Sequence, residues 1–157
     1  MHQKTIETKI TICRFNELSD EYKNLINKAK EQTENAYAPY SKFHVGAAVL
    51  LENGEIISGS NQENAAYPSG LCAERTAVFY ANSRFPDVAV KALAIVAWTN
   101  GKFLTQPATP CGACRQVLLE TENRFKKDIP VLLYGTENVY LIEKVKDLLP
   151  LSFDSIG

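Results

Sequence analysis

The sequence has no excess of basic charge. Its 157 residues include 17 Lys and Arg against 18 Asp and Glu, which leaves a formal net charge of −1. Proteins that hold a nucleic-acid backbone carry a basic surface that neutralises phosphates, and their affinity depends on it. The charge balance therefore argues against a polynucleotide substrate and fits a small, uncharged one.

The sequence also has no long apolar run. Although 45% of its residues are hydrophobic, no stretch approaches the ~20 apolar residues that span a bilayer. Residues 1–4 are not followed by the apolar region of an export signal. We therefore expect a cytoplasmic protein with no membrane partner. Residues 1–157 are expected to form a single domain, which at this length can bury a full core.

Cysteine is scarce, with 4 in the chain, and we do not expect disulfides. A cytoplasmic chain lies among reducing thiols, and a domain of this size needs no covalent cross-links. Cys13 lies in the alternating stretch 5–15, whose apolar residues predict a strand with a buried, inert thiol. Cys72, Cys111 and Cys114 remain available for chemistry.

Cys72, Cys111 and Cys114 suit a zinc ion. Three thiolates are soft ligands that leave the fourth tetrahedral position open to water, as a catalytic zinc requires. Residues 73–81 and 112–120 read as helices, so the sulfurs would lie at helix N-termini, which favour thiolate. A thioredoxin-like redox pair would leave Cys72 unexplained, and a structural zinc ribbon needs a second Cys-x-x-Cys, which the sequence lacks.

Glu74 is the only acid within the two cysteine stretches. A hydrolytic reaction of zinc-activated water needs a group that takes a proton from that water and later gives one to the leaving group. The alternative is a glutamate that only complements the helix dipole. Three thiolates around Zn²⁺ leave a charge of −1, which Arg75 or Arg115 could offset; a solvated salt bridge is equally expected for Arg115. We expect neither His2 nor His44 to be a ligand.

The cysteine stretches carry Glu two residues after the first ligand and Pro-Cys-x-x-Cys in the second, which is the signature of the zinc deaminases. The sequence resembles the cytidine deaminases, specifically their small, all-cysteine, homotetrameric branch, over roughly residues 20–153. The other resembling stretches are 40–48, 61–67 and 148–153. The resemblance implies zinc-dependent deamination of cytidine and 2′-deoxycytidine in pyrimidine salvage, with one zinc per chain.

The same resemblance implies roles for individual residues. It makes Glu74 the general acid and base, and Arg75 the residue that hydrogen-bonds ligand sulfurs and offsets their charge. It implies a D₂-type homotetramer in which neighbouring subunits complete the pockets. The substrate-binding residues that it implies are Phe43 stacked on the base, Asn61 and Glu63 at the ribose hydroxyls, Tyr67, Ala73, and Phe153 from an adjacent subunit.

These assignments have plainer alternatives. Phe43 could be a core aromatic, Asn61 and Glu63 could be solvated residues at a strand end, and Phe153 could fold back on its own subunit. A blasticidin-S deaminase would share the zinc site but lacks the same Asn-x-Glu-Asn pattern. A zinc-stabilised binding protein on this fold would leave Glu74 without a task.

The remaining patterns predict the elements of an α/β domain. Ser19 can cap a helix that Pro39 stops. Asn53-Gly54 indicates a hairpin between strands at 43–51 and 55–60. The other expected elements are strands at 5–15, 91–98 and 129–134, and a last helix around 141–149 that stops at Pro150. This order predicts a three-layer α/β/α sandwich with a mixed five-stranded sheet, preceded by an N-terminal strand extension, residues 1–15.

Overall fold

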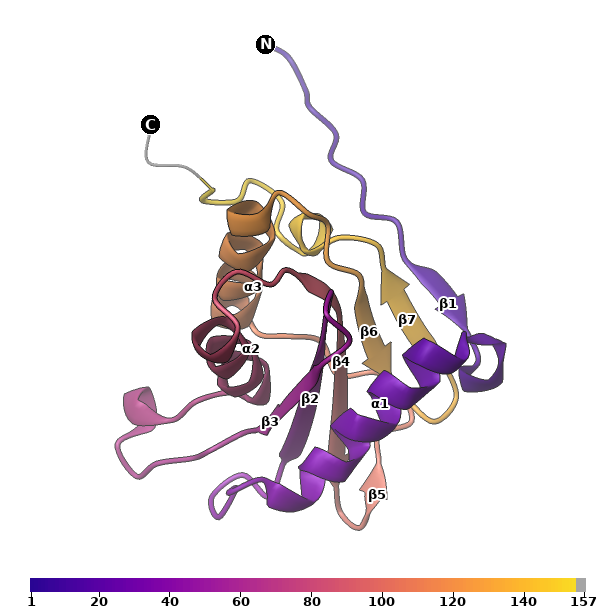
Figure 1. The fold of residues 1–157 in the computed structure, drawn as a ribbon. Coiled ribbons are helices and arrows are strands. Elements are labelled where there is room, and N and C mark those ends of the chain that lie inside the picture. The colour runs from indigo at the N-terminus through magenta and orange to yellow at the C-terminus, as the bar shows by residue number, and fades with distance from the viewer. Residues whose placement is uncertain (155–157) are drawn as a thin grey trace.

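The structure, a computed structural model, describes residues 1–154, and over these residues seven strands form one mixed sheet (Figure 1). The strand order is β1-β7-β6-β4-β2-β3, with β5 paired to β4. The strands are β1 (Thr11–Cys13), β2 (His44–Leu51), β3 (Ile56–Ser60), β4 (Val90–Thr99), β5 (Lys102–Phe103), β6 (Val131–Tyr134) and β7 (Val139–Ile142). Of the strand pairs, β4 and β6 run parallel, since the chain crosses over through a helix between them.

Three α-helices and four short 3₁₀ segments complete the described part of the chain. They are α1 (Asp20–Gln32), α2 (Ala73–Arg84) and α3 (Gly112–Phe125), with η1 (Phe15–Glu17), η2 (Thr33–Asn35), η3 (Tyr67–Ser69) and η4 (Val145–Leu148). Within residues 1–154 we find no helix with the length and apolar character needed to cross a membrane.

Helix α1 covers one face of the sheet, and α2 and α3 lie together on the other (Figure 1). The central strand β4 serves both layers: Ala94 and Val96 belong to the core under α1, and Leu93 and Ile95 to the core under α2 and α3. All four side chains are buried, which explains the continuous apolar run of this strand. The predicted α/β/α sandwich with a mixed sheet is confirmed.

Helix α1 approaches β2 closely at Gly46. A Cβ atom at this position would lie 1.9 Å from the carbonyl oxygen of Ala29 and 2.9 Å from the backbone nitrogen of Thr33. No side chain fits there, so glycine sets the spacing between the helix and the strand that follows Phe43.

Two local predictions near the first helix and the hairpin are confirmed. The Ser19 hydroxyl accepts a hydrogen bond of 3.3 Å from the N–H of Tyr22 and caps α1. Gly54 has a φ of 88° in the turn that joins the antiparallel strands β2 and β3, as a tight hairpin needs.

The first helix ends earlier than its predicted stop at Pro39. Helix α1 ends at Gln32, and η2 follows up to Asn35. The Thr33 hydroxyl donates to the carbonyl of Lys30 at 2.7 Å. A bond of this kind competes with the regular helical pattern and favours a tight last turn.

The predicted helix at 141–149 is wrong. Val139–Ile142 instead forms β7, antiparallel to β6, and of the rest only Val145–Leu148 turns, as η4. The residues of β7 are mostly β-branched or aromatic, which suits a strand, and its pairing with β6 leaves no trace in local periodicity. With the two-residue strand β5, β7 raises the number of strands among residues 1–154 from the predicted five to seven.

The N-terminal extension forms less structure than predicted. Of the expected strand 5–15, only Thr11–Cys13 pairs, as β1 at the sheet edge against β7. Ile10, directly before β1, and Ile12 within it are 46% and 59% exposed, since this short edge strand packs mainly against β7. Cys13 is half-buried rather than buried for the same reason.

Candidate active site

The sulfur atoms of Cys72, Cys111 and Cys114 converge, and all lie within 4.8 Å of one another. The Sγ of Cys111 lies 3.8 Å from that of Cys72 and 3.4 Å from that of Cys114. In a tetrahedral zinc site with Zn–S bonds of about 2.3 Å, sulfurs lie roughly 3.8 Å apart. The three cysteines therefore fit one zinc ion. Among residues 1–154 no other group of three His, Cys, Asp or Glu side chains converges in this way.

Two helix starts bring the sulfurs together. Cys72 is the N-cap residue of α2, Cys111 is the N-cap residue of α3, and Cys114 lies in the first turn of α3. Neither N-cap side chain makes a capping hydrogen bond, so both sulfurs remain available to a metal. The unpaired N–H groups at the two helix starts create a positive field that favours thiolates.

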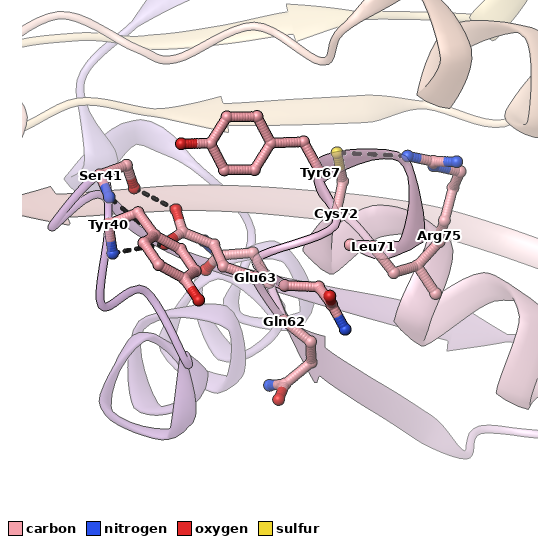
Figure 2. Close-up of a pocket in the computed structure, with 11 residues that line it drawn as sticks. Tyr40, Ser41, Gln62, Glu63, Tyr67, Leu71, Cys72 and Arg75 are labelled. Atoms are coloured by element: carbon pink, nitrogen blue, oxygen red, sulfur yellow. Dashed lines mark hydrogen bonds between the residues drawn. The ribbon is translucent and has the colours of Figure 1, made fainter.

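Arg75 adds a positive charge beside the sulfurs. Its Nη2 lies 3.6 Å from the Sγ of Cys72 (Figure 2), and its Nε is buried with no hydrogen-bond partner among residues 1–154. Hydrogen bonds from Cys114 and Arg75 lower the pKa of the Cys72 thiol to about 5. The bond to Cys72, together with burial, raises the pKa of the Cys114 thiol. Zinc binding must therefore displace protons from this cluster.

Glu74 shares a cavity with two of the three cysteines, Cys72 and Cys111. The cavity measures about 420 Å³ and its wall includes Phe43, Cys72, Ala73 and Cys111, a size that accommodates a small ligand. Glu74 is 5% exposed, and its burial, reinforced by the charge of Cys72, raises the pKa of its carboxyl. A carboxyl with a raised pKa can both accept and donate a proton nearer to neutral pH.

Asn61 fastens the backbone on both sides of His44. Its Oδ1 accepts from the N–H of Val45 at 2.8 Å, and its Nδ2 donates to the carbonyl of Phe43 at 2.9 Å. An amide side chain has two N–H hydrogens and two lone pairs. One hydrogen and one lone pair of Asn61 therefore remain for a ligand in the cavity, whose wall includes this residue.

Glu63 holds the loop that leads to Phe43. Its Oε2 accepts from the backbone N–H groups of Tyr40 and Ser41 at 2.9 and 3.3 Å, and its Oε1 accepts from the Ser41 hydroxyl (Figure 2). The Ser41 hydroxyl is the main cause that lowers the pKa of this carboxyl, and the two N–H groups add to it. Glu63 lines both the cavity at the sulfurs and an adjoining hollow of about 540 Å³.

Tyr67 and Phe153 are exposed in the single chain. The Tyr67 side chain is 77% exposed and meets the ring of Tyr40 edge-on, with 6.1 Å between ring centroids. Phe153 is 68% exposed, and its carbonyl accepts from the Nε2 of Gln116 at 2.8 Å. The structure thus gathers the other predicted substrate-binding residues around the sulfurs and leaves these two on the surface.

Sequence reasoning missed the contacts of Ser41 and Arg115. Ser41 stands two residues before Phe43 in a stretch already identified, so its position was a usable signal. Arg115 donates to the carbonyls of Pro110 and Leu148 at 2.8 and 2.9 Å. It forms no salt bridge with a carboxylate in the described part of the chain. No sequence pattern indicates these partners, since Leu148 is 33 positions away.

Comparison with known proteins identifies one family. A family model described as the cytidine and deoxycytidylate deaminase zinc-binding region matches residues 19–127. A curated cytidine deaminase from Sporosarcina psychrophila is 47% identical over 129 residues, covering 82% of this chain and 88% of the relative. One from Halalkalibacterium halodurans is 43% identical over 129 residues, covering 82% of this chain and 91% of the relative.

Solved structures agree with the sequence matches. The crystal structure of cytidine deaminase from Burkholderia pseudomallei has a TM-score of 0.69 and 42% identity, covering 83% of this chain and 97% of that one. Cytidine deaminase from Mycobacterium tuberculosis has a TM-score of 0.67 and 34% identity, covering 86% of this chain and 98% of that one. Sequence, fold and the cluster of three thiols together show that this chain belongs to the zinc-dependent cytidine deaminase family, in its all-cysteine form.

Proposed function

We propose that this cytidine deaminase acts hydrolytically on both cytidine and 2′-deoxycytidine, producing uridine or 2′-deoxyuridine and ammonia. The observation that carries the proposal is the buried carboxyl of Glu74 in a cavity lined by Cys72 and Cys111, whose sulfurs converge with that of Cys114. A structural zinc site is closed by four protein ligands, whereas three ligands and a neighbouring acid are what a catalytic site requires. The curated relatives, which are named cytidine deaminases, support the choice of substrate.

Glu74 moves the protons of the reaction. Zinc, when bound, supplies an activated water near neutral pH. Glu74 accepts a proton from that water while the oxygen of the water attacks C4 of the pyrimidine. Glu74 then passes the proton to the ring nitrogen N3. It then accepts the remaining proton of the added hydroxyl and passes it to the departing amine. One water enters and one ammonia leaves, and Glu74 ends in its starting protonation state.

Arg75 offsets the negative charge of the three zinc-binding thiolates. Three thiolates and Zn²⁺ sum to a charge of −1, which would make the water less acidic than it would be with neutral ligands. The 3.6 Å contact from Arg75 to Cys72 supports Arg75 as the donor that withdraws charge from the sulfurs. The starts of α2 and α3 act in the same direction.

Phe43, Asn61, Glu63 and Ala73 form the nucleoside end of the site. The half-buried ring of Phe43 offers an apolar face to the pyrimidine, and Ala73 closes the cavity beside it. Glu63 accepts from a ribose hydroxyl, with the remaining hydrogen of Asn61 as a second contact. The same carboxylate repels a 5′-phosphate. Nucleosides are therefore preferred over nucleotides, which separates this chain from deoxycytidylate deaminases.

The proposed active unit is a homotetramer in the cytoplasm, working in pyrimidine salvage. Support for assembly comes from large exposed aromatic side chains, namely Tyr67 at 77%, Phe79 at 47%, Tyr80 at 58% and Phe153 at 68%. Exposed aromatic residues of this size are typical of protein–protein surfaces. In the proposed tetramer Tyr67 and Phe153 complete pockets of adjacent subunits. Thiolate zinc ligands fit a reducing compartment.

A substrate comparison tests the proposal. Cytidine, 2′-deoxycytidine, cytosine, cytidine 5′-monophosphate and blasticidin S are supplied at equal concentration, and loss of the 4-aminopyrimidine absorbance is followed. The two nucleosides should react at least about tenfold faster than the others, because cytosine lacks the ribose hydroxyls that Glu63 and Asn61 contact and a 5′-phosphate is repelled by the Glu63 carboxylate. Equal turnover of cytosine and cytidine would contradict the roles of Asn61 and Glu63. A zinc-loaded protein that turns over no nucleoside would instead be a zinc-stabilised binding protein.

A further inference from the structure

Three side chains of helix α3 hydrogen-bond to the C-terminal segment, here residues 145–154. Arg115 donates to the carbonyl of Leu148 at 2.9 Å, and Gln116 donates to the carbonyl of Phe153 at 2.8 Å. The carboxylate of Glu122 accepts from the N–H groups of Val145 at 2.7 Å and Lys146 at 3.2 Å. The same helix starts at the N-cap Cys111 and carries Cys114. The helix that carries two of the cysteines is therefore bonded to the C-terminal segment along about two of its turns.

Of these three side chains, Arg115 also bonds to the loop that precedes Cys111. Its half-buried guanidinium donates through Nη1 to Leu148 and through Nε to the carbonyl of Pro110 at 2.8 Å. Pro110 is buried and directly precedes Cys111. Leu148, at the end of η4, is 8% exposed. A single side chain thus contacts the loop that supplies a zinc ligand and the segment that leads to Phe153.

The geometry of these two bonds fixes the position of Cys111. Because the peptide bond is planar, the Pro110 carbonyl cannot turn without moving the nitrogen and Cα of Cys111. A guanidinium holds its N–H donors in a rigid planar fork, whereas a lysine ammonium is a point charge on a flexible stem. Groups that orient a metal ligand commonly change metal affinity or activity by about 10- to 100-fold.

Glu122 holds the start of the C-terminal segment against α3. This carboxylate is 5% exposed and accepts from the N–H groups of Ile129, Val145 and Lys146. It thereby holds the first residues of η4, so that the Leu148 carbonyl at the end of η4 meets Arg115 at a set place.

We propose that Arg115 is a positioning residue that couples the Cys111 loop to the C-terminal segment. The retention of zinc and the placement of Phe153 then depend on the same side chain. The part that concerns Phe153 rests on the function proposed above, in which this ring serves the pocket of an adjacent subunit. The part that concerns Cys111 does not.

The test is Arg115→Lys, with Arg124→Lys as its matched control. Arg124 lies on the same helix and also donates to a backbone carbonyl, that of Pro86, which belongs to neither the zinc loop nor the C-terminal segment. Both variants are prepared as full-length, zinc-loaded protein. Zinc release to a chromogenic chelator is followed, and KM and kcat for cytidine are measured. Arg115→Lys should release zinc about tenfold faster and show a raised KM, while Arg124→Lys matches the wild type. Arg115→Gln gives the same comparison if the lysine variant does not fold.

Wild-type zinc release and wild-type KM in Arg115→Lys would overturn the proposal. Equal changes in the two arginine variants would also overturn it, because they would reflect a general loosening of α3. A change in only one of the two readouts would disprove the coupling. A wild-type protein that does not deaminate cytidine would contradict the proposed function, and the zinc-release comparison would then still decide whether Arg115 positions Cys111.

Discussion

The side chain of Asn61 donates a hydrogen bond of 2.9 Å to the carbonyl of Phe43. Its other end accepts from Val45, so the amide acts as an additional rung at the entry to β2. Glu63 holds the backbone on the other side of Phe43 through Tyr40 and Ser41. The two residues proposed to bind ribose therefore also hold the ring proposed to stack on the base.

Asn61→Ala should raise KM for cytidine more than it lowers kcat. The change leaves the Val45 N–H and the Phe43 carbonyl without partners, at a cost of ~1–3 kcal/mol, and releases the Phe43 ring that binds ground state and transition state alike. Steady-state kinetics measure the effect. Asn123→Ala, at an exposed position on α3, should leave both constants unchanged. An unaltered KM for Asn61→Ala would show that the bonds to β2 do not support the pocket.

The zinc cluster can be predicted from the sequence because its signal is local. Cys111 and Cys114 are placed by the start of one helix, and Cys72 and Glu74 by the start of another. Each segment carries its own helical pattern, and the chemistry of three thiolates then requires that the two starts meet. The sandwich follows in the same way from alternating helices and apolar strands.

Features that depend on distant partners could not be predicted. Val139–Ile142 is a strand because β6 and β1 pair with it, and its short apolar run fits a helix equally well. Cys13 is half-buried rather than buried, because periodicity does not reveal that its strand is short and packs mainly against β7. The bond from Arg115 to Leu148 joins segments whose proximity exists only in the folded chain.

Cys114→Ser should abolish zinc binding and activity, whereas Cys13→Ser should preserve both. Cys114 is fully buried in the cluster, and a hydroxyl is a poor substitute for a soft thiolate ligand. Loss of the metal should also lower the thermal midpoint, since a ligand at a hundredfold excess over its Kd stabilises by ~2.7 kcal/mol. Metal analysis and thermal unfolding, with and without a chelator, measure both effects. Zinc in equal amount in the two variants would contradict the assignment of ligands.

Phe153→Ala should raise KM for cytidine and leave the zinc content unchanged. In the proposed tetramer this ring, 68% exposed in the single chain, packs into the pocket of an adjacent subunit and buries apolar surface there. Ile12→Ala removes a comparably exposed apolar side chain from β1, at 59% exposure, and should not affect KM. Light scattering of the wild type should give the mass of four chains. A fully active monomer would refute the shared pocket.

The most direct test of the mechanism is Glu74→Gln, measured for zinc content and cytidine turnover on the same sample. Glutamine keeps the size of the side chain but cannot carry a proton between water, N3 and the departing amine. The variant should retain one zinc per chain and lose at least ~10²–10⁴-fold in kcat. Glu120→Gln, at an exposed position of α3, should behave as the wild type. A zinc-loaded Glu74→Gln protein that deaminates cytidine at nearly the wild-type rate would contradict the proposed proton transfer.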